Sequence, residues 1–169
     1  MSSNRPTDTT SQPKTKARKA RRISRDTMLM QIARTCAKRS TCNRPNGAVL
    51  VRDGRVIATG YNGSPPDRPH CIDMGCLLDD YSHCLAAIHA EINVILMAAR
   101  YGISTEGATL YCTTFPCPLC SKLLTNTGIV KVVYENLYSN MEGYGTLRSC
   151  GIEVIKYGNT RQRKSPRSV

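Results

Sequence analysis

Four residues in this 169-residue chain have the types and spacing that build a catalytic metal site. His89 and Glu91 lie close together, and Cys117 and Cys120 follow further along the chain. One histidine and two cysteines supply three zinc ligands, and three protein ligands leave a fourth position open for water. Zinc lowers the pKa of such a water towards neutrality. Glu91 comes two residues after the histidine, so its carboxylate can carry protons without binding the metal.

The spacing H-x-E followed by P-C-x-x-C is the general signature of zinc-dependent nucleobase deaminases. In that chemistry the glutamate takes a proton from water and passes it to a ring nitrogen and then to the departing ammonia. A structural zinc half-site or a redox pair would explain the two cysteines alone. Neither explains the histidine, the glutamate and the flanking prolines. The pattern predicts His89, Cys117 and Cys120 as zinc ligands and Glu91 as the catalytic acid and base.

The charge of the chain lies almost entirely near its two ends. The net charge is +12, yet residues 26–155 hold eleven basic and eleven acidic residues and are neutral. The segments 1–25 and 156–169 carry the excess Lys and Arg. Polar, basic segments of this kind cannot form a core. We therefore expect residues 1–23 and 158–169 to be disordered tails and residues 24–157 to form the zinc-dependent deaminase domain.

The composition indicates which cellular compartment and which classes of binding partner to expect. No apolar run approaches the roughly 20 residues that cross a bilayer, and the N-terminus lacks the apolar core of a signal peptide. Nine cysteines in such a chain favour metal binding in a reducing cytoplasm over disulfides. A neutral domain with no tryptophan and one phenylalanine does not favour specific nucleic-acid binding. We expect a cytoplasmic enzyme with no membrane partner and no specific nucleic-acid partner.

Periodicity places the motifs in an α/β fold. Ser24 is expected to cap a first helix, and Asp53-Gly54 to join two strands as a hairpin. After a poorly periodic stretch, helices are expected to begin near His89 and Cys117, where the helix dipole favours thiolate. The other expected elements are strands over 109–113, 129–134 and 152–155 and a helix over 141–149. This alternation predicts a three-layer α/β/α fold with a mixed five-stranded sheet.

The stretch from about residue 60 to 86 holds, or lies near, more candidate metal ligands. A closed four-ligand zinc site would order a segment with so little periodicity, so we expect a second, structural zinc there. The candidate ligands are Cys42, Cys71, Cys76, His83 and Cys84. The first three are preferred. The last two are alternatives for the fourth place, and spacing alone does not separate them.

Across residues 26–155 the chain resembles the deoxycytidylate (dCMP) deaminases of the cytidine deaminase superfamily, especially their bacterial and phage forms. The residues that carry the resemblance are Arg39-Ser40-Thr41-Cys42, Gly47-Ala48, Gly60-Tyr61-Asn62-Gly63-Ser64-Pro65, His89-Ala90-Glu91-Ile92-Asn93, Phe115-Pro116-Cys117-Pro118-Leu119-Cys120 and Tyr138.

This resemblance implies a cytidine-deaminase-like fold, a homohexamer, and hydrolysis of dCMP to dUMP and ammonia, which feeds thymidylate synthesis. It implies activation by dCTP with magnesium and inhibition by dTTP. The effector site would include Gly60, Tyr61, Asn62 and Gly63. The resemblance also supports the second zinc.

A nucleotide substrate needs a cation or hydroxyl for its phosphate, and the resemblance points to Arg100 and Tyr138. Arg100 can equally be an exposed helix-end residue. Asn46 stands where the family usually has an apolar residue, and it either contacts substrate or adjusts the start of a strand. Asn62 bonds the sugar or shapes a turn, and Phe115 stacks on the base or belongs to the core.

Two other functions fit parts of the pattern. A tRNA-editing or other polynucleotide deaminase shares the zinc motif, but it would want a basic, aromatic-rich surface on the domain. A non-enzymatic, zinc-stapled nucleotide-binding protein would keep the fold but would have no use for Glu91 as a proton carrier.

Overall fold

Five strands form one mixed sheet at the centre of the computed structural model, which describes residues 22–80 and 83–158. The sheet has the order β2-β1-β3-β4-β5. Strand β1 is antiparallel to β2 and β3, whereas β3, β4 and β5 run parallel. The strands are β1 Gly47–Arg52, β2 Arg55–Tyr61, β3 Thr109–Thr114, β4 Lys131–Asn136 and β5 Glu153–Lys156. The predicted α/β class and the mixed five-stranded sheet are confirmed.

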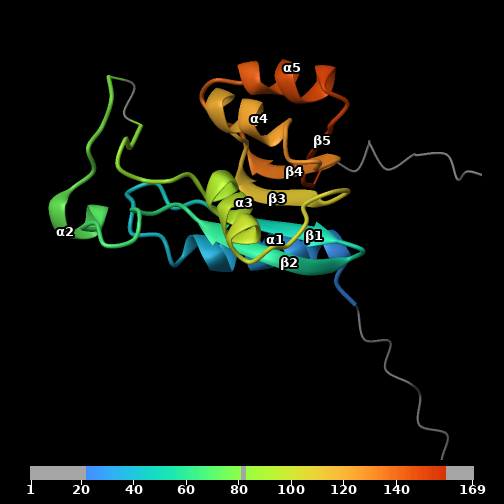
Figure 1. Cartoon of the computed structure of the whole chain (residues 1–169), viewed down its shortest axis with the longest axis horizontal. Coiled ribbons are helices and arrows are strands. Elements are labelled where there is room, and N and C mark those ends of the chain that lie inside the picture. Colours follow the sequence, from blue (N-terminus) through green and yellow to red (C-terminus); the bar gives the residue numbers. More distant parts are fainter. Residues whose placement is uncertain (1–21, 81–82, 159–169) are drawn as a thin grey trace, which may run out of the picture.

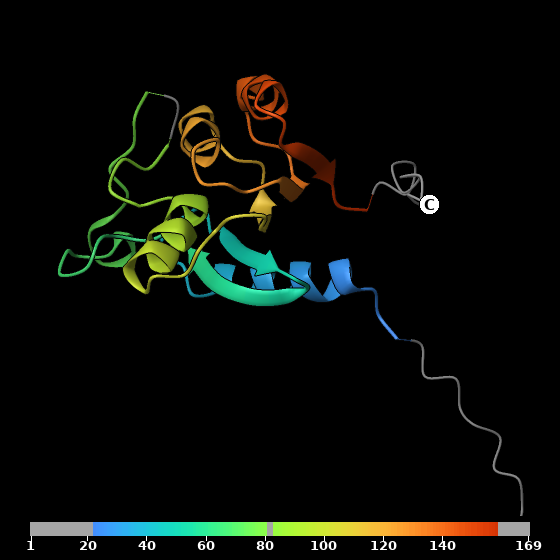
Figure 2. The ribbon, with the colours of Figure 1, turned by 45° about the vertical axis from the view of Figure 1, so that its right-hand side comes forward.

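Helices cover both faces of this sheet (Figures 1 and 2). Helix α1, Arg25–Ala37, packs on one face, and the other face carries α3, α4 and α5. The alternation of side chains along a strand explains the two cores: Leu50 and Leu110 face α3, whereas Val49 and Tyr111 face α1. The helices on the second face are α3 Ala90–Arg100, α4 Pro118–Leu124 and α5 Glu142–Ser149.

Capping and turn residues mark the ends of several of these helices and strands, as the sequence predicts. The Ser24 hydroxyl accepts a hydrogen bond from the Thr27 backbone N–H at 3.1 Å and caps α1. Asp53 and Gly54 have φ angles of 51° and 72°, the left-handed pair that a tight hairpin turn requires. Pro118 is the first residue of α4, where its missing N–H does no harm. The predicted strand over 129–134 begins later, at Lys131.

Between β2 and α3 the chain leaves the sheet as an arm, which we define as residues 62–88 (Figure 1). Among its described residues, 62–80 and 83–88, regular structure is limited to the four-residue helix α2, Cys71–Met74, and two isolated bridges, Gly63 with Ile88 and Leu78 with Cys84. Sequence periodicity did not predict α2, because one turn of helix is too short to show a repeat. Most of the arm's backbone therefore lacks regular hydrogen-bonded partners.

Helix α3 lies unusually close to β2 at Gly60. A Cβ atom at this position would come within 2.7 Å of the Val94 backbone nitrogen and 2.9 Å of the Ala90 carbonyl oxygen. The Asn93 amide also donates a hydrogen bond to the Tyr61 carbonyl at 2.7 Å. These contacts fix the N-terminal half of α3, and with it the H-A-E motif, against the sheet.

No helix in the described part of the chain is long and apolar enough to span a membrane. The predicted tails, apart from residues 22, 23 and 158, lie outside the described residues.

Candidate active site

The three predicted catalytic ligands come together from two helix N-termini. His89 is the N-cap of α3, and Cys117 is the N-cap of α4. The His89 Nδ1 atom lies 3.5 Å from the Cys117 sulfur and 3.4 Å from the Cys120 sulfur. Among the described residues this metal-ligand group has three members, all within 4.8 Å of one another. One imidazole and two thiols, with room for a further ligand, fit a catalytic zinc.

Local electrostatics favour the thiolate form of Cys117. Hydrogen bonding from Cys120 and from His89 lowers the pKa of Cys117 to about 4. The Cys120 backbone N–H, in the first turn of α4, also points at the Cys117 sulfur at 3.4 Å. The same contact with Cys117 raises the pKa of His89 above its ordinary value. The site thus stabilises a sulfur anion, the form in which cysteine binds metals.

Glu91 lies in the first turn of α3, beside the ligands, and is 5% exposed. Burial raises the pKa of its carboxyl to about 7, although its own backbone N–H, His89 and Cys120 act in the opposite direction. A carboxyl with a pKa near the working pH both accepts and releases protons readily. Glu91 is therefore placed and tuned for proton transfer.

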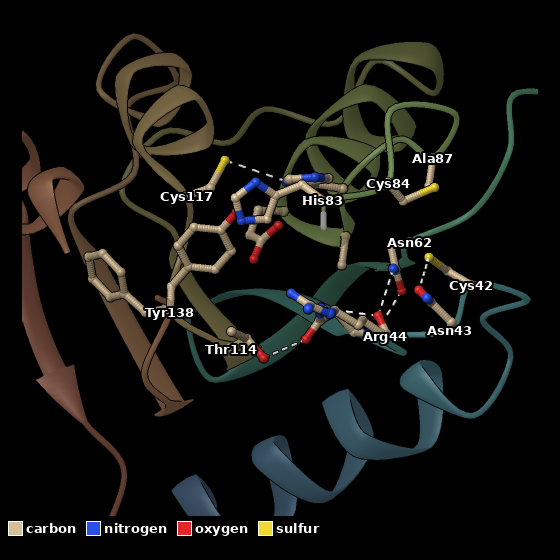
Figure 3. Close-up of a pocket in the computed structure, with 15 residues that line it drawn as sticks. Cys42, Asn43, Arg44, Asn62, His83, Cys84, Ala87, Thr114, Cys117 and Tyr138 are labelled. Carbon is tan, nitrogen blue, oxygen red and sulfur yellow. Dashed lines mark hydrogen bonds between the residues drawn. The ribbon is translucent and has the colours of Figure 1, made fainter. Parts of the chain in front are cut away.

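These residues form part of the wall of a cavity, shown in Figure 3. Asn46 and Asn62 lie on its wall and brace each other. The Asn62 side chain accepts from the Asn46 backbone N–H at 2.7 Å and donates to the Arg44 carbonyl at 2.9 Å. The Asn46 amide oxygen accepts hydrogen bonds from the Thr113 and Thr114 hydroxyls. Both asparagines therefore shape the loop before β1, and both reach the cavity.

Two predicted aromatic residues also line the cavity. Phe115 is 1% exposed and packs edge-to-face on Tyr134, with ring centroids 5.0 Å apart, so it belongs to the core as well as to the wall. Tyr138 stacks on His83, and burial raises the pKa of its phenol to about 12. Its hydroxyl therefore stays protonated at neutral pH and can donate a hydrogen bond.

The structure does not bring Arg100 to this cavity. Arg100 is the last residue of α3 and is exposed, whereas His89 caps the opposite end of the same helix. Eleven residues of helix separate the two ends by about 15 Å. Arg44, which the sequence analysis did not single out, lines the cavity instead. A single arginine in an irregular loop belongs to no periodic pattern that would have revealed it.

The second predicted ligand cluster also forms, with Cys84 as its fourth member. The sulfur atoms of Cys42, Cys71, Cys76 and Cys84 all lie within 4.8 Å of one another. Cys42 and Cys76 are 3.7 Å apart, and Cys71 and Cys84 are 3.5 Å apart. We call this group the four-cysteine cluster. His83, the alternative ligand, turns to the catalytic cavity instead.

The loop Gly60–Gly63 lies between two hollows. Asn62 faces the catalytic cavity, while Gly60, Tyr61 and Gly63 line a second cavity together with Arg68 and His70. The loop also supports the active site directly, because Gly63 and Ile88 exchange backbone hydrogen bonds of 3.2 and 2.8 Å just before His89.

Comparison with known proteins places this geometry in a family. The model of the "Cytidine and deoxycytidylate deaminase zinc-binding region" matches residues 23–136, which include both ligand clusters and Glu91. The chain belongs to this family. The predicted family membership is therefore confirmed.

Named relatives and solved structures agree with this membership. The chain is 46% identical over 118 residues to the ComE operon protein 2 of Bacillus subtilis, covering 69% of this chain. It is 40% identical over 148 residues to the deoxycytidylate deaminase of Saccharomyces cerevisiae, covering 83% of this chain. The match spans 62% and 47% of the lengths of these two curated relatives.

A solved structure is similar over almost its whole length. The dCMP deaminase of cyanophage S-TIM5, crystallised with dCMP and dUMP, superposes with a TM-score of 0.70 at 35% identity. The superposition covers 77% of this chain and 94% of the phage chain.

Proposed function

We propose that this protein hydrolyses dCMP to dUMP and ammonia and so supplies the precursor of thymidylate synthesis. The observation that carries the proposal is the convergence of His89 Nδ1 and the Cys117 and Cys120 sulfurs beside the buried Glu91 carboxyl. The choice of dCMP is supported by relatives whose names are deoxycytidylate deaminase and by the dCMP and dUMP bound in the cyanophage structure.

His89, Cys117 and Cys120 would hold the catalytic zinc. When bound there, zinc supplies a Lewis acid that makes water acidic enough to react near neutral pH. Glu91 takes a proton from the attacking water and gives it to N3 of cytosine as the water oxygen bonds to C4. It then carries the second proton to the amino group as the C4–N bond breaks and ammonia leaves. One buried carboxyl thus handles both proton transfers.

The rest of the cavity would hold the nucleotide. Phe115 and Tyr138 offer apolar surface and a hydroxyl, and the two asparagines offer amide groups. Arg44 lines the cavity and would supply a cation for the 5′-phosphate, whereas Arg100 lies at the far end of α3. Arg44→Ala should therefore raise KM for dCMP far more than KM for cytidine, which has no phosphate.

We further propose that the four-cysteine cluster binds a structural zinc. Four cysteine sulfurs within 4.8 Å of one another supply the four ligands of a closed tetrahedral site. Such a metal would order the arm, whose backbone has little regular structure of its own.

The second cavity is a candidate effector site. Arg68 and His70 line it and would attract the phosphates of dCTP or dTTP, and Asp67 offers a carboxylate for the accompanying magnesium. We propose activation by dCTP with magnesium and inhibition by dTTP, in a homohexamer. Steady-state rates with each nucleotide, together with the molar mass in solution, test these points.

Ammonia release from matched substrates tests the central proposal. We expect dCMP to be deaminated faster than dCTP, cytidine or a tRNA anticodon stem. Faster deamination of the RNA would favour a polynucleotide deaminase instead. Binding of dCMP by a zinc-loaded protein that releases no ammonia from any of the four would indicate a nucleotide-binding protein.

A further inference from the structure

The arm contributes neighbouring residues to two different sites. Cys84 belongs to the four-cysteine cluster and also lines the catalytic cavity, and the preceding residue, His83, lines that cavity as well. A peptide bond joins the two, so the position of one backbone constrains the other. A residue that binds the proposed structural metal and a residue at the proposed substrate site are therefore neighbours in the chain.

His83 is held in place by contacts at several points. Its backbone N–H donates to one Asp79 carboxylate oxygen at 2.7 Å, and its ring Nδ1 lies 3.1 Å from the other. Asp79 N–H donates back to the His83 carbonyl at 2.9 Å, and Leu85 N–H donates to the Leu77 carbonyl at 2.8 Å. These bonds tie the backbone on either side of His83 to Leu77 and Asp79, and the Asp79 carboxylate also contacts the His83 ring.

The ring of His83 meets a residue from the opposite side of the fold. It stacks on Tyr138, which follows β4, with ring centroids 5.4 Å apart and an interplanar angle of 19°. Figure 3 shows the two rings together at one wall of the cavity, across from Arg44 and Asn62. The wall that faces the substrate site is thus completed by the arm.

We propose that His83 is a positioning residue for substrate, held against Tyr138 by Asp79 and the four-cysteine cluster, so that occupancy of that cluster sets nucleotide affinity. This inference rests on the proposed deaminase function. It assigns the second metal a role beyond stability: without it, the arm loses its anchor at Cys84 and the wall at Tyr138 opens.

Linkage makes the effect reciprocal. If metal in the four-cysteine cluster tightens nucleotide binding, then bound nucleotide tightens metal binding in that cluster by the same factor. A purely structural metal would show no such coupling to the nucleotide.

The test compares His83→Ala, His83→Phe and Cys76→Ser with the wild type, with Cys150→Ser as the control. Cys150 is an exposed cysteine outside both clusters. The readouts are the Kd of dUMP by calorimetry, kcat and KM for dCMP, and zinc per chain. Because dUMP is the product, its binding is measured without turnover.

We expect His83→Ala to keep its zinc and raise both the Kd of dUMP and KM about tenfold, the scale of one lost aromatic contact. Loss of ordinary binding raises KM with kcat little changed. His83→Phe, which retains the stack on Tyr138, should recover most of the affinity. Cys76→Ser should lose one zinc and weaken dUMP binding to a similar degree. A His83→Ala/Cys76→Ser double variant should bind dUMP no more weakly than either single variant, because both substitutions act through the same wall of the cavity.

A second measurement uses only folded protein. Saturating dUMP should slow the release of both zincs to a chelator in the wild type, but only the catalytic zinc in His83→Ala. The inference is overturned if His83→Ala binds dUMP as the wild type does, or if dUMP fails to protect the second zinc in the wild type. A wild type that neither binds dUMP nor deaminates dCMP overturns the proposed function itself, and this inference with it.

Discussion

Burial gives Glu91 two properties at once. The low polarity around the carboxyl moves its pKa to about 7, which suits a group that must accept and donate protons in one cycle. The same burial makes the ionised form costly, because charge is poorly stabilised away from water. The catalytic value of this residue and its cost to the fold therefore have one cause.

Replacing Glu91 by glutamine should separate binding from catalysis. Glu91→Gln keeps the shape of the side chain but removes its titratable proton, so we expect normal zinc content and dCMP binding. Turnover should fall by roughly 10²–10⁴-fold, the usual contribution of general acid–base catalysis. Ammonia release measured beside metal content checks this. Activity above about a tenth of the wild-type rate would rule out the assigned role.

The same variant should show a pH-dependent gain in stability in chelator-treated protein. The folded pKa lies above the ordinary value of 4.5, so the folded state holds the proton more tightly, and stability falls as pH rises through about 7. At pH 5, just above the ordinary pKa, we expect Glu91→Gln to be more stable than the wild type by less than about 1 kcal/mol. At pH 8 the variant should be more stable, by on the order of 2 kcal/mol. Denaturant titrations at both pH values measure this.

The exposed Glu142→Gln is the control for that titration. Because the Glu142 side chain is exposed and lies outside both ligand clusters, this variant should differ from the wild type by the same amount at both pH values. An equal shift for Glu91→Gln at pH 5 and pH 8 would contradict the raised pKa.

At the scale of single residues, sequence reasoning succeeded where a motif had fixed spacing and stopped where it had none. The fixed spacing of His89, Cys117 and Cys120 predicts that they lie together, and in the structure their ligand atoms are within 4.8 Å of one another. His83 and Cys84 were inseparable, because neighbouring residues in an irregular segment can face in any direction. Only the three-dimensional path of the arm places the Cys84 sulfur in the cluster, at the border of the cavity, and leaves His83 at the cavity outside the cluster.

At the scale of elements, the position of α3 on β2 decides whether the active site is assembled. His89 and Glu91 lie at the N-terminal end of α3. This end of the helix packs so closely on Gly60 that no side chain fits at position 60. The two cysteine ligands, Cys117 and Cys120, lie at the start of α4, which packs mainly against α5. A displacement of α3 by a fraction of an ångström would thus shift His89 relative to the two cysteines.

Gly60→Ala should therefore damage both stability and catalysis. The added methyl meets backbone atoms at under 3 Å, so α3 must move. We expect a loss of about 1–3 kcal/mol, as for other overpacked sites, and a marked fall in kcat. At Gly63 the nearest atom to an added Cβ is a Tyr61 ring carbon at 3.5 Å, so Gly63→Ala is a matched control with little effect. Thermal unfolding and turnover of both variants test this, and equal effects would contradict it.

Elements with strong local signals were predicted almost residue by residue. Ser24, the Asp53-Gly54 pair and Pro118 mark boundaries through capping and turn chemistry that acts within a few residues. The arm could not be predicted in the same way. Its helix α2 is one turn long, and its ligands are brought together by the path of the whole segment rather than by any repeat.

We expect about two zinc atoms per chain, with separable roles. Cys71→Ser removes a buried member of the four-cysteine cluster and should leave about one zinc, with the arm opened to trypsin near Arg68. Elemental analysis and limited proteolysis measure both effects. A wild-type zinc content near one atom per chain would contradict the second metal site and would mean that the four cysteines serve only as packing residues.

At the scale of the whole molecule, positive charge and the candidate site are segregated. Residues 26–155 are neutral and contain every residue placed at the cavity, while the excess of Lys and Arg belongs to the two ends. Free nucleotide and nucleic acid would therefore meet different parts of the chain.

Deleting residues 1–22 and 159–169 should leave dCMP turnover nearly unchanged, because the cavity of the described domain is lined by residues between 42 and 138. Any affinity for RNA should collapse on deletion and should already weaken at high salt, since it arises from counterion release. Steady-state kinetics and RNA binding at two salt concentrations measure the two effects. Loss of dCMP turnover in a truncated protein that keeps its fold and zinc would overturn this division.

The close spacing of the cluster sulfurs also has a consequence for redox chemistry. Cys42 lies 3.7 Å from Cys76, and Cys71 lies 3.5 Å from Cys84. Metal and oxidant compete for the same sulfur lone pairs, since peroxide turns a thiolate into a sulfenic acid that a neighbouring thiol converts to a disulfide. Zinc bound to the four-cysteine cluster would therefore protect the arm from oxidation. Protein purified without zinc should lose metal-binding capacity in air, and a thiol reductant should restore it.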